Sequence, residues 1–91
     1  MRLIAILSMP GNNSWNGKWT GESENYSINV GNFGKTRAEE LIGRYSYAFG
    51  DGWVASVEIR KAKPREKVSG KFCGYNWMVD SIIRDGKILS F

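Results

Sequence analysis

The apolar residues of this chain come in short runs, and this limits what it can fold into. The first run, Leu3–Leu7, is five residues long, and nothing approaches the ~18 consecutive apolar residues of a membrane span. A secretory signal peptide has an apolar core of about 7–15 residues, and here Pro10 and Gly11 follow without a cleavage site of small residues. We therefore interpret residues 2–8 as a buried first strand and expect no association with a membrane.

Alternation and glycine-containing turns predict further strands. Residues 24–30 alternate apolar and polar side chains and predict a second strand. The loop expected from Pro10 to Trp19 contains Asn16-Gly17, a strong signal for a two-residue hairpin turn. Residues 53–59 alternate in the same way and predict another strand.

A first helix is predicted over residues 37–44. Thr36 and Glu39 have the spacing of a capping box, in which each side chain bonds the backbone of the other residue. Ala38, Leu41, Ile42 and Tyr45 share one helical face, while Gly43 fits either a C-cap or a helix interior. Residues 45–49 remain open, because they either continue the helix to Tyr47 or form a hairpin with residues 53–59.

A second helix is predicted over residues 77–84. Asn76 can act as its N-cap, and Gly86 stands at the position of a C-cap glycine. Between them, four apolar residues fall on one helical face: Met78, Val79, Ile82 and Ile83. The alternative is a hairpin through Asp85-Gly86 that joins residues 81–84 to 87–91. Together these elements predict a single α+β domain over residues 1–91, with a mostly antiparallel sheet of about three to five strands and one or two short helices.

The residues that the chain lacks exclude several kinds of site. It has no histidine and one cysteine, Cys73, so it contains no Ser-His-Asp or Cys-His nucleophile, no zinc ligand set and no internal disulfide. Its nine carboxylates are scattered and match no calcium-binding loop. A carboxylate pair such as Asp51 with Glu58 or Asp80 has no spacing that supports hydrolysis. We therefore expect a protein that is not an enzyme and needs no metal or cofactor.

The positive charge is concentrated in one segment. The whole chain has a net charge of +4, residues 1–34 are balanced, and residues 60–71 combine six cations with the single carboxylate of Glu66. We interpret residues 60–71 as an exposed, mobile loop that contacts phosphate or an acidic protein face, unless its charges only keep the loop soluble. The six candidate contacts are Arg60, Lys61, Lys63, Arg65, Lys67 and Lys71.

Aromatic residues supply the other candidate binding sites. The first candidate, Trp15 to Trp19, could stack on bases while Lys18 meets a phosphate, or could be a hairpin that caps the core. The second is Gly50-Asp51-Gly52-Trp53. Its glycines either let the backbone approach a ligand closely or form an ordinary turn. The third, residues 72–78, could line a pocket beside Cys73, although a buried, inert cysteine and core aromatics fit the segment better. The candidate ligand or partner contacts are Trp15, Asn16, Lys18, Trp19, Tyr47, Asp51, Trp53, Tyr75 and Trp77.

Three segments resemble a set of short, uncharacterised proteins encoded by bacteriophages and prophages. They read NSWNGKW at 13–19, FGDGW at 49–53 and FCGYNWM at 72–78, and the resemblance spans residues 3–89. The WNGK element at 15–18 is also similar to one in a phage family that sequesters nucleotide signals and includes anti-CRISPR members. The resemblance implies a small phage protein that binds and blocks a component of the bacterial host, in the host cytoplasm.

Two functions follow as hypotheses. In the first, the protein inhibits a host defence system by stoichiometric binding to a defence protein, with residues 60–71 steering the encounter and Trp15, Trp19, Tyr47 and Trp53 as anchors. In the second, it binds a nucleotide or nucleic acid, including a cyclic-nucleotide defence signal, through tryptophan stacking and the basic residues. An edge strand such as 87–91 could also pair two copies into a homodimer.

Overall fold

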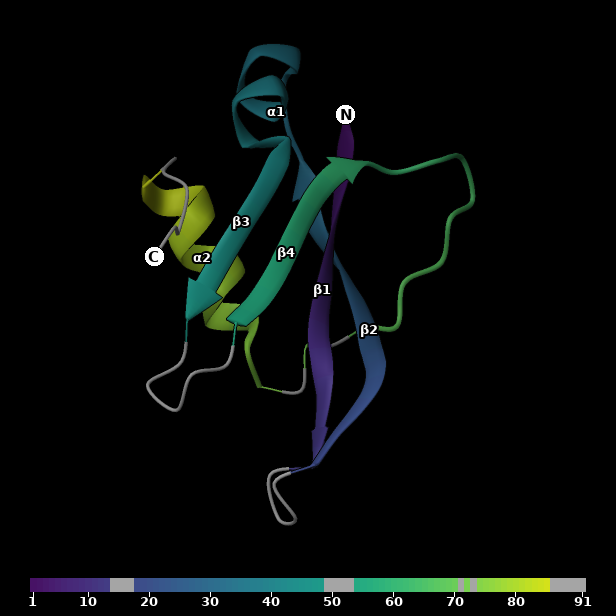
Figure 1. The fold of residues 1–91 in the computed structure, drawn as a ribbon. Helices are drawn as coiled ribbons and strands as arrows, with labels where there is room; N and C mark the ends of the chain where they lie inside the picture. Colours follow the sequence, from purple (N-terminus) through teal and green to yellow (C-terminus); the bar gives the residue numbers. More distant parts are fainter. Residues whose placement is uncertain (14–17, 49–53, 71, 73, 86–91) are drawn as a thin grey trace.

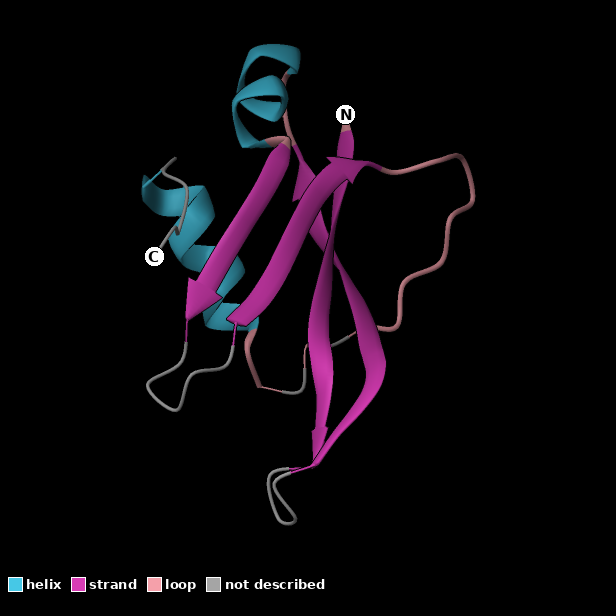
Figure 2. Ribbon diagram, viewed as in Figure 1, coloured by secondary structure: helices cyan, strands magenta, loops and turns pink. Residues whose placement is uncertain are grey.

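The fold is a four-stranded antiparallel sheet with two short helices, as the sequence predicts (Figures 1 and 2). The computed structural model describes residues 1–13, 18–48, 54–70, 72 and 74–85. The elements in chain order are β1 (Arg2–Asn13), β2 (Lys18–Asn32), α1 (Lys35–Leu41), β3 (Gly43–Ala48), β4 (Val54–Lys61) and α2 (Asn76–Asp85). The strand order across the sheet is β2-β1-β4-β3, so the first strand of the chain lies in the interior of the sheet.

The first two strands form a hairpin that is longer than the sequence predicts. Pairing of β1 with β2 continues to Asn13 and Lys18, so the loop expected from Pro10 to Trp19 is wrong at residues 10–13 and 18–19. Residues 14–17 lie outside the described residues. Pairing of β1 with β4 ends at Ser8, so Pro10 has a neighbour strand on one side only. A proline without a backbone N–H is tolerated at such an edge, and the register shifts just beyond it.

The first helix starts earlier and ends earlier than predicted. α1 spans Lys35–Leu41, its N-cap is Gly34, and no side chain caps it, so the capping box of Thr36 and Glu39 is wrong. Ile42 adopts an extended conformation while its N–H donates to the Ala38 carbonyl at 3.0 Å, and the chain enters β3 at once. The strand interpretation of residues 45–49 is therefore confirmed through Ala48, and Phe49 lies outside the described residues.

The last strand and helix differ from expectation mainly at their ends. β4 runs from Val54 to Lys61, so Arg60 and Lys61 belong to a strand and not to a loop. The helical interpretation of residues 77–84 is confirmed by α2, which begins at Asn76. The predicted N-cap residue Asn76 is instead the first residue of the helix, and its Oδ1 accepts a hydrogen bond from the N–H of Phe72, before the helix, at 3.1 Å. The predicted strand 87–91 lies outside the described residues.

The two faces of the sheet have different characters. Alternate residues of the strands, among them Leu3, Leu7, Val57 and Ile59, pack with both helices in one core cluster; the helix side and the connection contribute Ala38, Leu41, Phe72, Met78, Val79 and Ile82. The intervening residues point to the opposite face. Among the residues that the structure describes, no helix combines the length and apolarity that crossing a bilayer requires.

Candidate functional site

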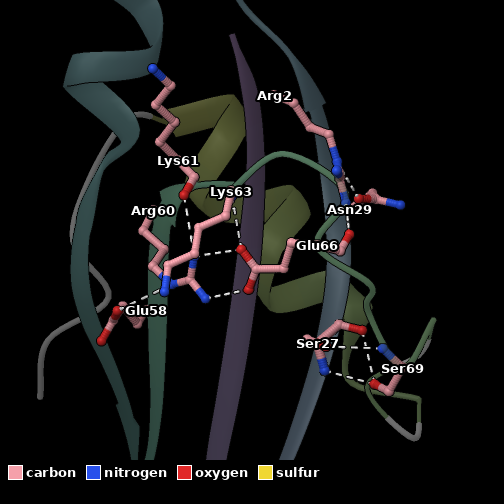
Figure 3. A network of polar contacts seen from close by, with 9 residues as sticks. All are labelled: Arg2, Ser27, Asn29, Glu58, Arg60, Lys61, Lys63, Glu66 and Ser69. Atoms are coloured by element: carbon pink, nitrogen blue, oxygen red, sulfur yellow. Dashed lines mark hydrogen bonds and ion pairs between the residues drawn. The ribbon is translucent and has the colours of Figure 1, made fainter.

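The candidate site is the face of the sheet that the helices leave uncovered. The chain leaves β4 at Lys61, and residues 62–70, here called the crossover segment, pass over this face to the outer edge of β2. Figure 3 shows the contacts that hold the segment, which come from β1, β2 and β4. These residues include most of the basic stretch that the sequence singles out.

Glu66 is the centre of these contacts. Its carboxylate accepts hydrogen bonds from both terminal nitrogens of the Arg60 guanidinium, Nη1 at 2.9 Å and Nη2 at 2.5 Å, and from the backbone N–H of Lys63 at 2.9 Å (Figure 3). A two-point contact of this kind matches the planar fork of arginine to the two carboxylate oxygens. The hydrogen bonds from Arg60 and Lys63 lower the pKa of Glu66 from 4.5 to about 2, and the bond to Glu66 raises the pKa of Arg60.

Arg2 attaches the crossover segment to the first two strands. Its Nη2 donates to the carbonyl oxygen of Glu66 at 2.7 Å, and its Nε donates to Oδ1 of Asn29 in β2 at 3.0 Å (Figure 3). The carbonyl of Arg2 accepts from the N–H of Ala62 at 3.0 Å, which extends the pairing of β1 with β4 by one residue. Arg2 therefore fixes both the start of the segment and its middle.

Two serines attach the end of the segment to the edge of β2. The N–H of Ser27 donates to Oγ of Ser69 at 2.7 Å, and the N–H of Ser69 donates to Oγ of Ser27 at 2.9 Å. The Ser69 hydroxyl and the N–H of Gly70 both donate to the Ser27 carbonyl, at 2.9 and 2.8 Å. The outward backbone groups of β2 at Ser27 are thus satisfied by the segment, which covers this edge of the sheet at that point.

An apolar residue lies beneath the polar contacts. Ile4 shares a face of β1 with Arg2, opposite the core cluster, yet only 1% of it is exposed. Its partners across the sheet are Arg60 in β4 and Asn29 in β2, two of the residues that contact the crossover segment or its anchor Arg2. We infer that the segment covers Ile4, so its attachment has an apolar as well as a polar component.

The segment presents cations that its own contacts do not neutralise. The side chain of Arg60 is paired with Glu66 and lies 3.9 Å from Glu58, which also contacts Arg44 at 3.2 Å. By contrast, four cationic residues are exposed and form no ion pair within the described part of the chain: Lys61, Lys63, Arg65 and Lys67. Arg60 is therefore a structural member of the candidate site. The four exposed residues are here called the cationic ridge. Three of them lie in the crossover segment, and Lys61, which pairs with Leu3, ends β4 on the helix-covered face.

The other candidates fall in separate places. Tyr75 packs against the core cluster, and Trp77, on the first turn of α2, is 43% exposed. Lys18 and Trp19 begin β2, and Tyr47 belongs to β3, where the structure describes the strand backbone. The remaining candidates, Trp15, Asn16, Asp51, Trp53 and Lys71, lie outside the described residues, as does Cys73.

The start of β2, at Lys18 and Trp19, and the cationic ridge are at opposite ends of β1. Leu3 pairs with Lys61, whereas Asn13 pairs with Lys18. Ten residue steps along a strand correspond to about 30 Å. One small ligand therefore cannot touch Lys18 and Lys61 together.

Sequence reasoning missed the residues that hold the site together. Arg2, Ser27, Asn29 and Ser69 have no motif that marks them, because they meet only when the crossover segment lies on the sheet. Glu66 did carry a signal, since it is the single carboxylate among six cations. An isolated acid in a basic run is a candidate internal partner for one of its neighbours, and here that neighbour is Arg60.

No cluster of three or more histidine, cysteine or carboxylate side chains suited to a metal ion occurs among the described residues. Comparison with protein-family models, curated proteins and solved structures finds no match to this chain.

Proposed function

We propose that the protein is a non-enzymatic binding protein that attaches stoichiometrically to an acidic surface of a host defence protein and inhibits it. The cationic ridge makes the contact. The observation that carries the proposal is the fixed attachment of the crossover segment, which contains three of the four ridge residues, through Glu66, Arg2 and the serine pair. The identity of the target class comes from the resemblance to phage-encoded proteins.

Fixed attachment matters because binding has an entropic cost. A loop that must be ordered on association loses affinity, whereas a loop already held by its own protein does not. The carboxylate of Glu66 forms an ion pair with Arg60, so the four exposed cations of the ridge remain able to contact a partner. Their field accelerates encounter with an acidic surface, while apolar and aromatic contacts elsewhere supply most of the affinity.

The separation of the ridge from the start of β2, at Lys18 and Trp19, favours a large partner. A span of about 30 Å exceeds what one nucleotide can bridge but is within a standard protein interface, which buries about 800 Å² on each side. A partner that contacted both places would be a protein face or a long nucleic acid.

The test is capture of a partner from a bacterial host lysate, followed by kinetics with purified components. We compare Lys63→Ala/Lys67→Ala with a control of equal charge loss, Lys35→Ala/Arg84→Ala, whose exposed residues lie on α1 and α2. The ridge variant should lower the association rate roughly tenfold at low salt and change dissociation little, while the control leaves both rates nearly unchanged. Recovery of no specific partner, together with no protection of phage in defence-positive strains, would end the proposal.

Nucleotide or nucleic-acid binding is the alternative, and the four unpaired cations of the ridge are what favours it. Tryptophan fluorescence titrated with oligonucleotides and cyclic dinucleotides distinguishes the two. Under this alternative, changing the whole ridge to alanine abolishes binding nearly completely, and the affinity of the native protein falls steeply with salt. A flat signal for every ligand at low salt eliminates it.

A further inference from the structure

The two edge strands of the sheet, β2 and β3, differ in whether other parts of the chain bond their outer sides. The outer edge of β2 is bonded at Ser27 by Ser69 and Gly70 of the crossover segment. The other edge is β3, and no described residue pairs with its outer side (Figure 1). An edge strand presents a row of N–H and C=O groups that another strand can pair with.

The direction of the backbone groups on β3 follows from the hydrogen-bond pattern. Ser27 directs its N–H and C=O outward, so Ile6, opposite it, directs its own groups away from β2 and toward Glu58 in β4. The N–H and C=O of Glu58 therefore point toward β1 and not toward β3. Arg44, which is opposite Glu58 in β3, directs its own N–H and C=O to the free edge. By the two-residue repeat, the same holds for Ser46 and Ala48.

β3 carries few of the features that keep an edge strand from pairing. Its register with β4 runs through six consecutive pairs without a shift, and it contains no proline. Its only charged side chain is Arg44, which Glu58 contacts at 3.2 Å. β2 differs in two respects: its pairing with β1 has two register shifts, and the crossover segment bonds its outer edge at Ser27. Proteins usually guard exposed edges with bulges, prolines or unpaired charges.

We propose that the free edge of β3 pairs with β3 of a second copy of this chain, antiparallel about a two-fold axis that passes beside Ser46. Identical strands are self-complementary in this arrangement. With Ser46 opposite Ser46 of the second copy, Arg44 comes opposite Ala48, and all three outward residues of each strand form hydrogen-bonded pairs, about six bonds in total. A register one residue shorter, centred on Tyr45, retains about four.

The charges of the molecule agree with this register. The two Arg44 positions are four residues apart along the paired strands, or about 13 Å, so they do not face each other. The crossover segment reaches the opposite edge of the sheet at Ser27, which keeps its cations in the two copies apart although each chain carries +4. The dimer is a continuous eight-stranded sheet with a cationic ridge toward each end. This inference goes beyond the proposed function and does not depend on it.

Cysteine cross-linking tests the axis directly. In a Cys73→Ser background, Ser46→Cys places two thiols in a hydrogen-bonded antiparallel pair, whose Cα atoms are about 5.5 Å apart and within the range of a disulfide. Arg44→Cys is the matched control, because it lies on the same face and edge but about 13 Å from its copy. Mild oxidation should give at least tenfold more cross-linked dimer from Ser46→Cys than from Arg44→Cys.

The solution mass gives the second measurement. Light scattering after gel filtration should report twice 10.3 kDa for the native chain. Ser46→Pro removes an outward N–H without touching the pairing with β4, and should return the mass to that of a monomer with an unchanged circular dichroism spectrum, while Ser46→Ala stays dimeric. A native chain that is monomeric at 100 μM overturns the proposal. It does so whether the edge of β3 is then covered by another segment of the chain or by a strand of a different protein. Equal cross-linking of the two cysteine variants also overturns it.

Discussion

Ile4→Ala is the sharpest test of how the crossover segment is held. Ile4 lies on the face opposite the core cluster and is 1% exposed, so truncation removes three buried carbon atoms. Isoleucine-to-alanine changes in cores cost about 2–5 kcal/mol, and the lower half of that range applies here because a covering loop can partly collapse onto the gap. We expect a loss of about 2–3 kcal/mol in the free energy of unfolding.

Ile6→Ala provides the matched control. Ile6 is the next residue on the same face of the same strand, but it is only partly buried. Removal of the same atoms should cost about 1 kcal/mol, since the cost scales with the apolar area that was hidden from water. The difference between the two variants isolates the cover over Ile4.

Urea and thermal denaturation measure both variants. For a chain of 91 residues, an unfolding entropy of about 2.1 cal/mol/K per residue converts 1 kcal/mol into roughly 5 °C. Ile4→Ala should lower Tm by about 10–15 °C and Ile6→Ala by about 5 °C. Hydrogen exchange should show faster exchange of Gly70 in Ile4→Ala, because its N–H bonds Ser27 at the end of the segment. Equal losses of stability in the two variants would refute the argument that the segment buries Ile4.

Two further predictions concern the polar attachment. The pKa of Glu66 falls from 4.5 to about 2 on folding, so its ionised form stabilises the protein above pH 4.5 and this contribution is lost as the pH falls toward 2. Glu66→Gln should therefore flatten that part of the stability curve, and a variant that loses stability between pH 4.5 and 2 as steeply as the native protein contradicts the assignment. Ser69→Ala and Ser27→Ala should each cost about 0.5–1.5 kcal/mol, and a double-mutant cycle should give a coupling of about 0.5–1 kcal/mol because each hydroxyl bonds the other residue's backbone. Additive losses within error would show that the two serines act independently.

The elements that follow a strong local pattern agree with the sequence prediction. Four of the five residues Leu3–Leu7 are buried on β1, and the stripe of residues 78, 79 and 82 is buried on α2. Both signals are produced by side chains that must leave water, whichever partner they meet. The ends of elements were predicted less well, because the backbone decided them. Pro10 stays in β1 since the neighbouring pairing with β4 ends at Ser8.

Part of the candidate site could likewise be predicted from the sequence, and part could not. The cations of residues 61–67 could be found from the sequence, because a concentration of charge needs no structure to be seen. The hydrogen bonds that attach this segment to the sheet could not be predicted, since Arg2 and Glu66 are 64 positions apart and Ser27 and Ser69 are 42 apart. Nothing local distinguishes those serines from others in the chain.

The sequence alone therefore determined the fold class, the absence of histidine and of a cysteine pair, and the location of the excess positive charge. The tertiary structure decided which cation is neutralised, since Arg60 pairs with Glu66 while the ridge does not. It also decided that the basic stretch is attached to the sheet and to the edge of β2 at Ser27. The physical reason is that charge and hydrophobicity belong to single residues, whereas a hydrogen bond between distant residues exists only once packing has brought its donor and acceptor together.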